Sequence, residues 1–121
     1  MVEPRIRRGE DIEYDQVGAA AGLEKGVLLG DEHDAPHFAM RRFTLEPGAA
    51  VPKYTNAVEH GQYVLDSEYV VGIEGEEHTV RAGDSILIPA GAVHWYRNEG
   101  EREGAFICVV PAGDDAIELV E

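Results

Sequence analysis

Short apolar runs separated by turn residues dominate the chain, and they predict strands rather than helices. The segments expected to form strands are 26–30, 37–46, 50–55, 60–65, 69–73, 77–80, 85–88, 92–97 and 105–110. Strand-length runs with a turn signal every few residues are typical of antiparallel sandwiches and barrels. No stretch carries a convincing 3.6-residue periodicity of an amphipathic helix. The pattern therefore predicts an all-β protein.

The two ends of the chain are less regular than its middle. Residues 1–25 show no clear strand alternation and are expected to form an N-terminal arm, with a turn of helix or a loose crossover at 18–22. Residues 116–120 alternate and predict an edge strand, which could pair with a neighbouring subunit. A chain of 121 residues without repeats or linkers is expected to be a single domain over 1–121, with its core at about 37–111.

The segment 83–98 has the most clearly defined local structure. An apolar run at 85–88 is followed by Pro89-Ala90-Gly91, which forces a tight reversal because proline fixes φ and glycine accepts a positive φ. The chain then returns through His94 and stops at a turn cluster, 98–100. His94 is therefore expected three residues beyond a rigid corner, on an antiparallel strand, where a barrel can turn it inward.

The spacing of this segment resembles the second motif of the cupin superfamily, G-x5-P-x-G-x2-H-x3-N. The matching residues are Gly83, Pro89, Gly91, His94 and Asn98. The first motif of that family is expected upstream, and residues 47–65 carry it in a degenerate form. The resemblance implies a double-stranded β-helix, the jelly-roll barrel, built of antiparallel strands. It leaves the function open, because one fold hosts many chemistries.

In metal-binding members of that family, the first motif supplies a His-x-His pair and then a Glu or His, and the second motif supplies a further histidine. Carried over by position, the four ligands fall on Tyr54, Asn56, His60 and His94. An alternative alignment moves the third ligand to Gly61, which cannot coordinate. The resemblance thus implies a divalent transition metal (Mn, Fe, Ni, Cu or Zn) held in the barrel by His60 and His94, or a degenerate site that holds none.

Two histidines alone bind a divalent metal poorly, so a third donor is needed. It would have to come from Tyr54 as a phenolate, from the amide oxygen of Asn56 or Gln62, or from Cys108. An unperturbed phenol loses its proton only near pH 10. Gln62 shares strand parity with His60, so both side chains are expected to face the cavity. The candidate catalytic residues are Tyr54 and Gln62. Tyr54 could alternatively move protons or form part of the cavity wall.

Two further positions depend on which way a strand faces. Arg42 lies in the strand expected at 37–46, and it would pair with a substrate carboxylate if its face pointed inward. The alternation does not settle that face, and a surface arginine is the simpler interpretation. Of Trp95 and Tyr96, one is expected to line the cavity while the other packs outward.

Composition narrows the range of partners. The 24 acidic against 10 basic residues give a net charge of −14, which argues against nucleic-acid binding because such a surface repels phosphate backbones. The chain has no apolar run long enough for a membrane span. A single cysteine excludes an internal disulfide, and no signal-peptide pattern follows Met1, so a cytoplasmic location is expected. The acidic excess and scarce lysine resemble proteins of salt-loving organisms, with an ordinary acidic protein as the alternative.

Three functions remain open. The first is a metal-dependent enzyme acting on a small organic molecule, of dioxygenase, isomerase or lyase type, and therefore an oxidoreductase or isomerase. The second is a metal-free module that binds a small polar ligand in the barrel. The third is a scaffold whose role is assembly, because the resemblance implies a homodimer formed through sheet edges.

Overall fold

The computed structural model describes residues 3–18, 20–112 and 117–119. These residues form eleven strands and two single-turn 3-10 helices, with no α-helix among them. In chain order the elements are η1 (Gly9–Asp11), β1 (Tyr14–Gln16), β2 (Leu23–Leu29), η2 (Asp31–His33), β3 (Phe38–Leu45), β4 (Ala50–Asn56), β5 (His60–Asp66), β6 (Glu68–Ile73), β7 (Glu76–Arg81), β8 (Ser85–Ile88), β9 (His94–Arg97), β10 (Gly104–Pro111) and β11 (Ile117–Leu119). The all-β prediction is confirmed.

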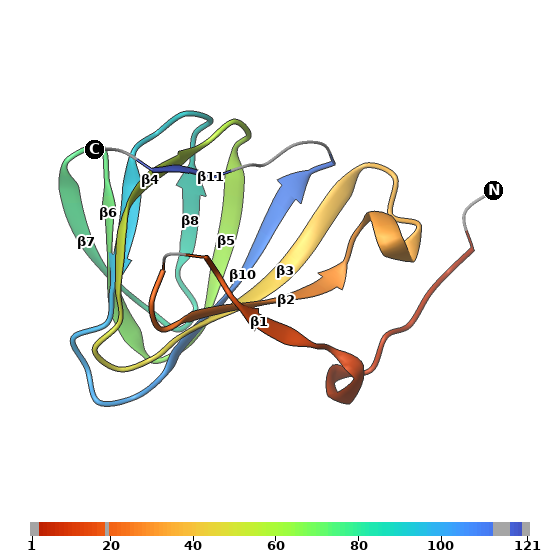
Figure 1. The fold of residues 1–121 in the computed structure, drawn as a ribbon, viewed down its shortest axis with the longest axis horizontal. Coiled ribbons are helices and arrows are strands. Elements are labelled where there is room, and N and C mark those ends of the chain that lie inside the picture. The colour runs from red at the N-terminus through yellow and green to blue at the C-terminus, as the bar shows by residue number, and fades with distance from the viewer. Residues whose placement is uncertain (1–2, 19, 113–116, 120–121) are drawn as a thin grey trace.

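Two antiparallel sheets face each other and enclose the core (Figure 1). The larger sheet has the strand order β1-β2-β3-β10-β5-β8, and the smaller has the order β11-β4-β9-β6-β7. The chain passes repeatedly from one sheet to the other, as from β3 to β4 and from β4 to β5, so that it winds around the barrel. This is the double-stranded β-helix expected from the sequence, and that prediction is also confirmed.

Large side chains from both sheets fill one continuous core. Leu45, Val64, Tyr69, Tyr96 and Phe106 are each at most 2% exposed. The rings of Tyr96 and Phe106 stack across the two sheets with centroids 5.2 Å apart, and Tyr69 lies 5.8 Å from Phe106. Burying one such side chain contributes about 1.5–3 kcal/mol. The core therefore ties β9 and β6 of one sheet to β10 of the other.

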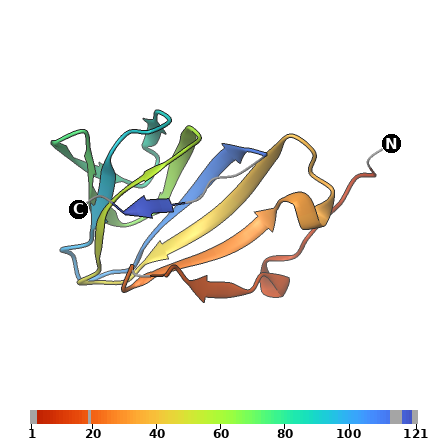
Figure 2. The ribbon, with the colours of Figure 1, turned by 45° about the horizontal axis from the view of Figure 1, so that its top comes forward.

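Part of the expected N-terminal arm belongs to the larger sheet. β1 and β2 form a hairpin, and β2 pairs with β3 along its length (Figure 2). A Cβ at Gly26 would lie 2.8 Å from side-chain atoms of Ile12 and Tyr14, so glycine lets the chain before and in β1 pack closely on β2. The sequence does not reveal β1, because this strand is only three residues long and mostly exposed. β2 begins at Leu23, three residues before the strand expected at 26–30.

The expected edge strand near the C-terminus is present in residues 117–119, whereas 116 and 120 lie outside the described residues. β11 pairs with β4 of the same chain, with Ile117 opposite Asn56 and Leu119 opposite Tyr54. The pairing is thus made within the chain rather than with a neighbouring subunit. As a result β4, which carries two motif positions, has a neighbour on each side instead of an open edge.

No helix in the described part of the chain is long and apolar enough to cross a membrane.

Candidate functional site

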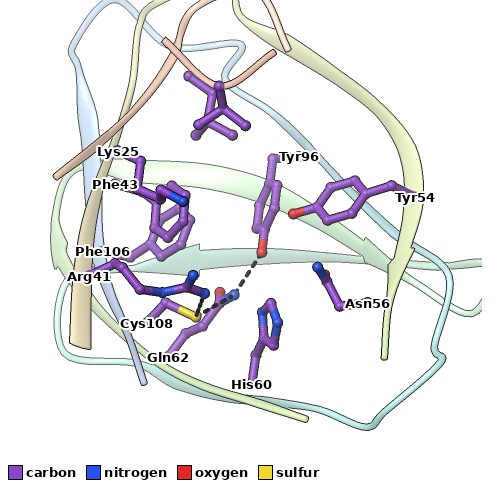
Figure 3. A pocket seen from close by; sticks show the side chains of 12 residues that line it. Lys25, Arg41, Phe43, Tyr54, Asn56, His60, Gln62, Tyr96, Phe106 and Cys108 are labelled. Atoms are coloured by element: carbon purple, nitrogen blue, oxygen red, sulfur yellow. Dashed lines mark hydrogen bonds between the residues drawn. The ribbon is translucent and has the colours of Figure 1, made fainter. Parts of the chain in front are cut away.

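A cavity of about 240 Å³ lies between the two sheets (Figure 3). The larger sheet and the turn after β1 contribute Val17, Leu23, Lys25, Arg41, Phe43, His60, Gln62, Phe106 and Cys108, and the smaller sheet contributes Tyr54, Asn56 and Tyr96. The volume equals that of about eight water molecules at liquid density. The cavity is therefore sized for a small molecule.

Strand alternation carries the motif side chains into the barrel. Along β5, His60 and Gln62 are each 5% exposed, and Gly61 between them lies on the exposed face. Their shared inward orientation is what parity predicts. On β4, Tyr54 and Asn56 are likewise buried and line the cavity. The structure thus brings the predicted site residues together, while their roles as ligands or catalysts stay predictions.

His94 opens β9 opposite Tyr54 of β4 and is 1% exposed. Its Nδ1 lies 2.9 Å from the carbonyl oxygen of Ala92, and since a carbonyl can only accept, Nδ1 carries the proton and Nε2 keeps its lone pair. Nε2 is buried and has no hydrogen-bond partner among the described residues. Burial lowers the pKa of His94, and the bond to Ala92 offsets part of that effect. The ring is therefore held as a neutral imidazole.

Tyr54 packs directly on His94, with ring centroids 4.1 Å apart, and its hydroxyl is turned toward Tyr96 (Figure 3). Burial raises the pKa of Tyr54 well above its usual value, and the neighbouring Tyr96 adds to the effect through its charge and a shared hydrogen bond. Burial also raises the pKa of Tyr96. Both phenols therefore keep their protons, and neither is available as a phenolate near neutral pH.

A polar network crosses the cavity from the larger sheet to Tyr96. Gln62 Nε2 donates to the Tyr96 hydroxyl at 2.7 Å and lies 3.9 Å from Cys108 Sγ. Arg41 Nη2 lies 3.6 Å from the same sulfur. On the far side of the amide, Gln62 Oε1 is buried without a hydrogen-bond partner among the described residues. The network fixes the amide and leaves one strong acceptor in the cavity.

β3 turns Arg41, not Arg42, into the cavity. Arg41 is 5% exposed and lines it, whereas Arg42 points to the opposite face, where its Nη1 lies 3.5 Å from the Tyr14 hydroxyl. The condition for a carboxylate partner at Arg42 is therefore not met, and the simpler interpretation of Arg42 as a surface arginine agrees with this placement. Sequence reasoning missed Arg41. A signal was present, because Arg41 shares its parity with Phe43 and Leu45, the more apolar face of the strand.

Tyr96 is the inward member of the aromatic pair beside His94, and it is 1% exposed. Trp95 lies on the outer face against Gly72. A Cβ at Gly72 would fall 2.0 Å from the Trp95 ring, so only glycine admits the indole there.

The residues at the four family positions do not fit a transition metal well. His60 and His94 offer imidazoles from opposite sheets, with ring centroids 5.9 Å apart. The other two positions hold Asn56, a neutral amide, and Tyr54, a phenol that keeps its proton. Among the described residues, no group of three or more His, Cys, Asp or Glu side chains could hold a metal ion. Transition metals select imidazole and anionic donors, so this set of two imidazoles, an amide and a protonated phenol is a poor match for such an ion.

The charge of the cavity is opposite to that of the whole chain. Lys25 and Arg41 line it, and no acidic side chain appears among its described lining residues. The chain as a whole carries a net charge of −14. Cationic side chains without acidic ones beside them give a cavity a positive potential, which attracts negatively charged ligands. The cavity is therefore an environment that favours an anion.

Comparison with known proteins identifies relatives along most of the chain. The family model described as a cupin domain matches residues 41–110. A curated relative, oxalate oxidase GF-3.8 from Triticum aestivum, is 28% identical over 127 residues, a match that covers 88% of this chain and 56% of that protein. The chain thus spans little more than half the length of this relative.

Several solved structures share the fold of this chain although their sequences are only distantly similar to it. Polyketide cyclase RemF from Streptomyces resistomycificus matches with a TM-score of 0.88 and 23% identity, over 98% of this chain and 86% of that one. A predicted oxalate decarboxylase from Thermotoga maritima matches with a TM-score of 0.75 and 23% identity, over 96% of this chain and 100% of that one. At these identities the likeness shows the fold alone, and the names of these proteins refer to different reactions.

Proposed function

Because this chain belongs to the cupin family, we propose that its barrel cavity binds a small organic carboxylate, with Arg41 and Lys25 as the cationic groups. The observation that carries the proposal is the charge of the cavity. Two cationic side chains and no described acidic one line it, inside a chain with a net charge of −14.

Arg41 is suited to this role by its shape as well as its charge. A guanidinium presents N–H groups in a planar fork that matches the two oxygens of a carboxylate. At a separation of 4 Å and an effective dielectric of 20, such a charge pair is worth about 4 kcal/mol before desolvation is counted. On the same wall, Phe43 and Phe106 stack with centroids 5.0 Å apart and offer an apolar surface to the rest of the ligand.

The names of two relatives agree with this class of ligand. One is an oxalate oxidase and the other a predicted oxalate decarboxylase, and oxalate is a small dicarboxylate. This agreement supports the carboxylate class without choosing a particular acid.

The candidate catalytic residues take defined roles in this proposal. Tyr54 keeps its proton because burial raises its pKa, so it can donate a hydrogen bond to a bound oxygen but cannot accept a proton as a phenolate. Gln62 orients the Tyr96 hydroxyl by donating to it. The neutral ring of His94 leaves Nε2 as a proton acceptor behind Tyr54.

Calorimetric titration of chelator-treated protein with a panel of small carboxylates tests the proposal. We expect binding by the wild type and a loss of affinity of about tenfold or more in Arg41→Gln. Arg42→Gln is the matched control, because it removes the same group from the opposite face of the same strand, and it should bind like the wild type. Equal affinity in the wild type and Arg41→Gln, or no binding across the panel, would overturn the proposal.

A metal-dependent enzyme is the second candidate, and the two inward-facing imidazoles of His60 and His94 support it. Metal analysis of protein purified without chelator distinguishes the candidates. Near-stoichiometric Mn, Fe, Ni, Cu or Zn that is lost in the His60→Ala/His94→Ala double variant would favour the enzyme. A wild type that stays metal-free after loading with each of the five would exclude it.

We also propose that the protein forms a homodimer through the outer face of the larger sheet. Tyr63, Leu87 and Val109 lie on the adjacent strands β5, β8 and β10 and are 50%, 66% and 37% exposed. All three are uncharged, so two copies can bury them against each other without removing a charge from water. Leu87→Glu should shift the mass in solution from dimer to monomer, whereas a monomeric wild type would contradict the proposal.

A further inference from the structure

We infer that the preferred ligand is a hydroxy carboxylate, whose O–H donates to Gln62 Oε1 while its carboxylate meets Arg41. This inference rests on the proposed function, because the same cavity must first accept a carboxylate. It adds a second recognition element, which selects among carboxylates by a hydrogen-bond donor on the ligand.

The orientation of the Gln62 amide carries the inference. An amide nitrogen carries two hydrogens, whereas an amide oxygen can only accept. Gln62 Nε2 directs its hydrogens at the Tyr96 oxygen, 2.7 Å away, and at the Cys108 sulfur, 3.9 Å away. Oε1 lies at the other end of the amide, away from these two partners.

Gln62 Oε1 therefore faces the cavity as an acceptor that the protein itself does not satisfy. The side chain is 5% exposed, and Oε1 has no hydrogen-bond partner among the described residues. A hydrogen-bond donor for Gln62 Oε1 therefore has to come from solvent or from a ligand. A ligand that displaces that solvent without offering a donor leaves a buried carbonyl unpaired, which is unfavourable, while a ligand O–H restores the bond.

The donor and the carboxylate must lie close together in the ligand. Arg41 Nη2 is 3.6 Å and Gln62 Nε2 is 3.9 Å from the same Cys108 sulfur, so the two head groups are only a few ångströms apart (Figure 3). A 2-hydroxy or 3-hydroxy acid has this spacing. The stacked rings of Phe43 and Phe106 leave an apolar wall for its side chain.

Two matched pairs of acids test the inference by calorimetry with chelator-treated protein. The pairs are lactate with propionate and mandelate with phenylacetate, in which only the hydroxyl differs. We expect the wild type to bind the hydroxy acid of at least one pair about tenfold or more tightly than its partner, equivalent to about 1.4 kcal/mol. The methyl ether of mandelate, which keeps the oxygen but lacks the donor, should bind like phenylacetate.

The variant Gln62→Met is close in shape and removes the acceptor, so it should bind both members of a pair alike while Arg41→Gln weakens both. Equal affinity of the wild type for both members of each pair would overturn this inference and leave the proposed function standing. A preference retained in Gln62→Met, or a methyl ether bound as tightly as mandelate, would also overturn it. Failure of the wild type to bind any of these acids would overturn the proposed function as well. The comparison with the ether needs no variant, so it holds even if Gln62→Met does not fold.

Discussion

The segments 47–65 and 83–98 sit side by side in the barrel, yet their motif positions serve different ends. In 83–98 the matching residues other than His94 build the frame: Gly83 and Gly91, for example, take φ values of +96° and +78° at turns. In 47–65 the corresponding positions line the cavity with Tyr54, Asn56 and His60. The spacing of a motif can therefore support the fold while the side chains at its ligand positions carry a different chemistry.

Asn98 shows how strongly the second segment is bound into the frame. Its Nδ2 donates to the carbonyl oxygens of Leu45 and Arg102 at 2.9 Å each, and its Oδ1 accepts from the Gly100 amide at 3.0 Å. Its backbone carbonyl accepts from the amide of Gly48 at 2.8 Å. This one residue thus joins β3, the loop that follows β9 and the turn that opens the first segment.

The largest expected effect comes from giving the first segment the family's own ligands. Tyr54→His combined with Asn56→His would add two imidazoles to His60 and His94, and we expect the affinity for divalent transition metals to rise by orders of magnitude. Metal analysis after loading and desalting should find near-stoichiometric metal in the double variant and far less in the wild type. Equal metal content in the two proteins would show that Tyr54 and Asn56 do not separate this site from a metal centre.

The next largest effect is expected on stability, from Asn98→Ala in the second segment. The change removes three hydrogen bonds and leaves the buried carbonyl of Leu45 without its side-chain donor, so the free energy of unfolding should fall by about 3 kcal/mol. Tyr54→Phe in the first segment removes only a hydroxyl and should cost about 1 kcal/mol. Urea unfolding of both variants measures the difference, and equal losses would erase the contrast between the segments.

Replacing either of two matched glycines by alanine should change stability by a smaller amount, and the two changes should have opposite signs. An added Cβ meets nothing within 4 Å at either Gly91 or Gly61, so only the backbone differs. Gly91 has a positive φ, and Gly91→Ala should cost about 1–2 kcal/mol. Gly61 has an ordinary strand φ, so Gly61→Ala should be neutral or stabilise by a few tenths of a kcal/mol to about 1 kcal/mol. Thermal midpoints that shift in the same direction would contradict the prediction.

The smallest effect concerns His94 and pH. Burial lowers the pKa of His94 in the folded protein below its usual value. As the pH falls through about 6.5, the unfolded chain takes up a proton that the folded protein resists, so stability is lost on acidification. In chelator-containing buffer, His94→Gln should show a weaker loss of stability between pH 7 and pH 5 than the wild type. Parallel pH profiles for the two proteins would contradict it.

The sequence was most informative where backbone geometry depends on single residues. Gly83, Pro89, Gly91 and Asn98 predict the corner and the turn that follows, and the fold agrees. It was least informative at the edges. β1 buries little and therefore carries no apolar pattern, and the partner of β11 depends on where the chain returns, which local sequence does not encode.

The site was predicted only in part, for a physical reason. The inward position of His60, Gln62 and His94 follows from motif spacing and parity. The inward face of β3 does not, because its two faces carry one arginine each and differ only in how apolar their neighbours are. The positive charge of the cavity therefore follows from how β2 and β3 are placed in the fold and not from their local sequence.

The buried position of Cys108 allows its chemical labelling to report on opening of the barrel. It is the only cysteine of the chain, it is fully buried, and it lines the cavity. A thiol reagent can reach it only when the barrel opens or when the reagent enters the cavity. The rate of labelling therefore reports how often the interior becomes accessible, and a bound ligand should lower that rate according to the fraction of molecules it occupies.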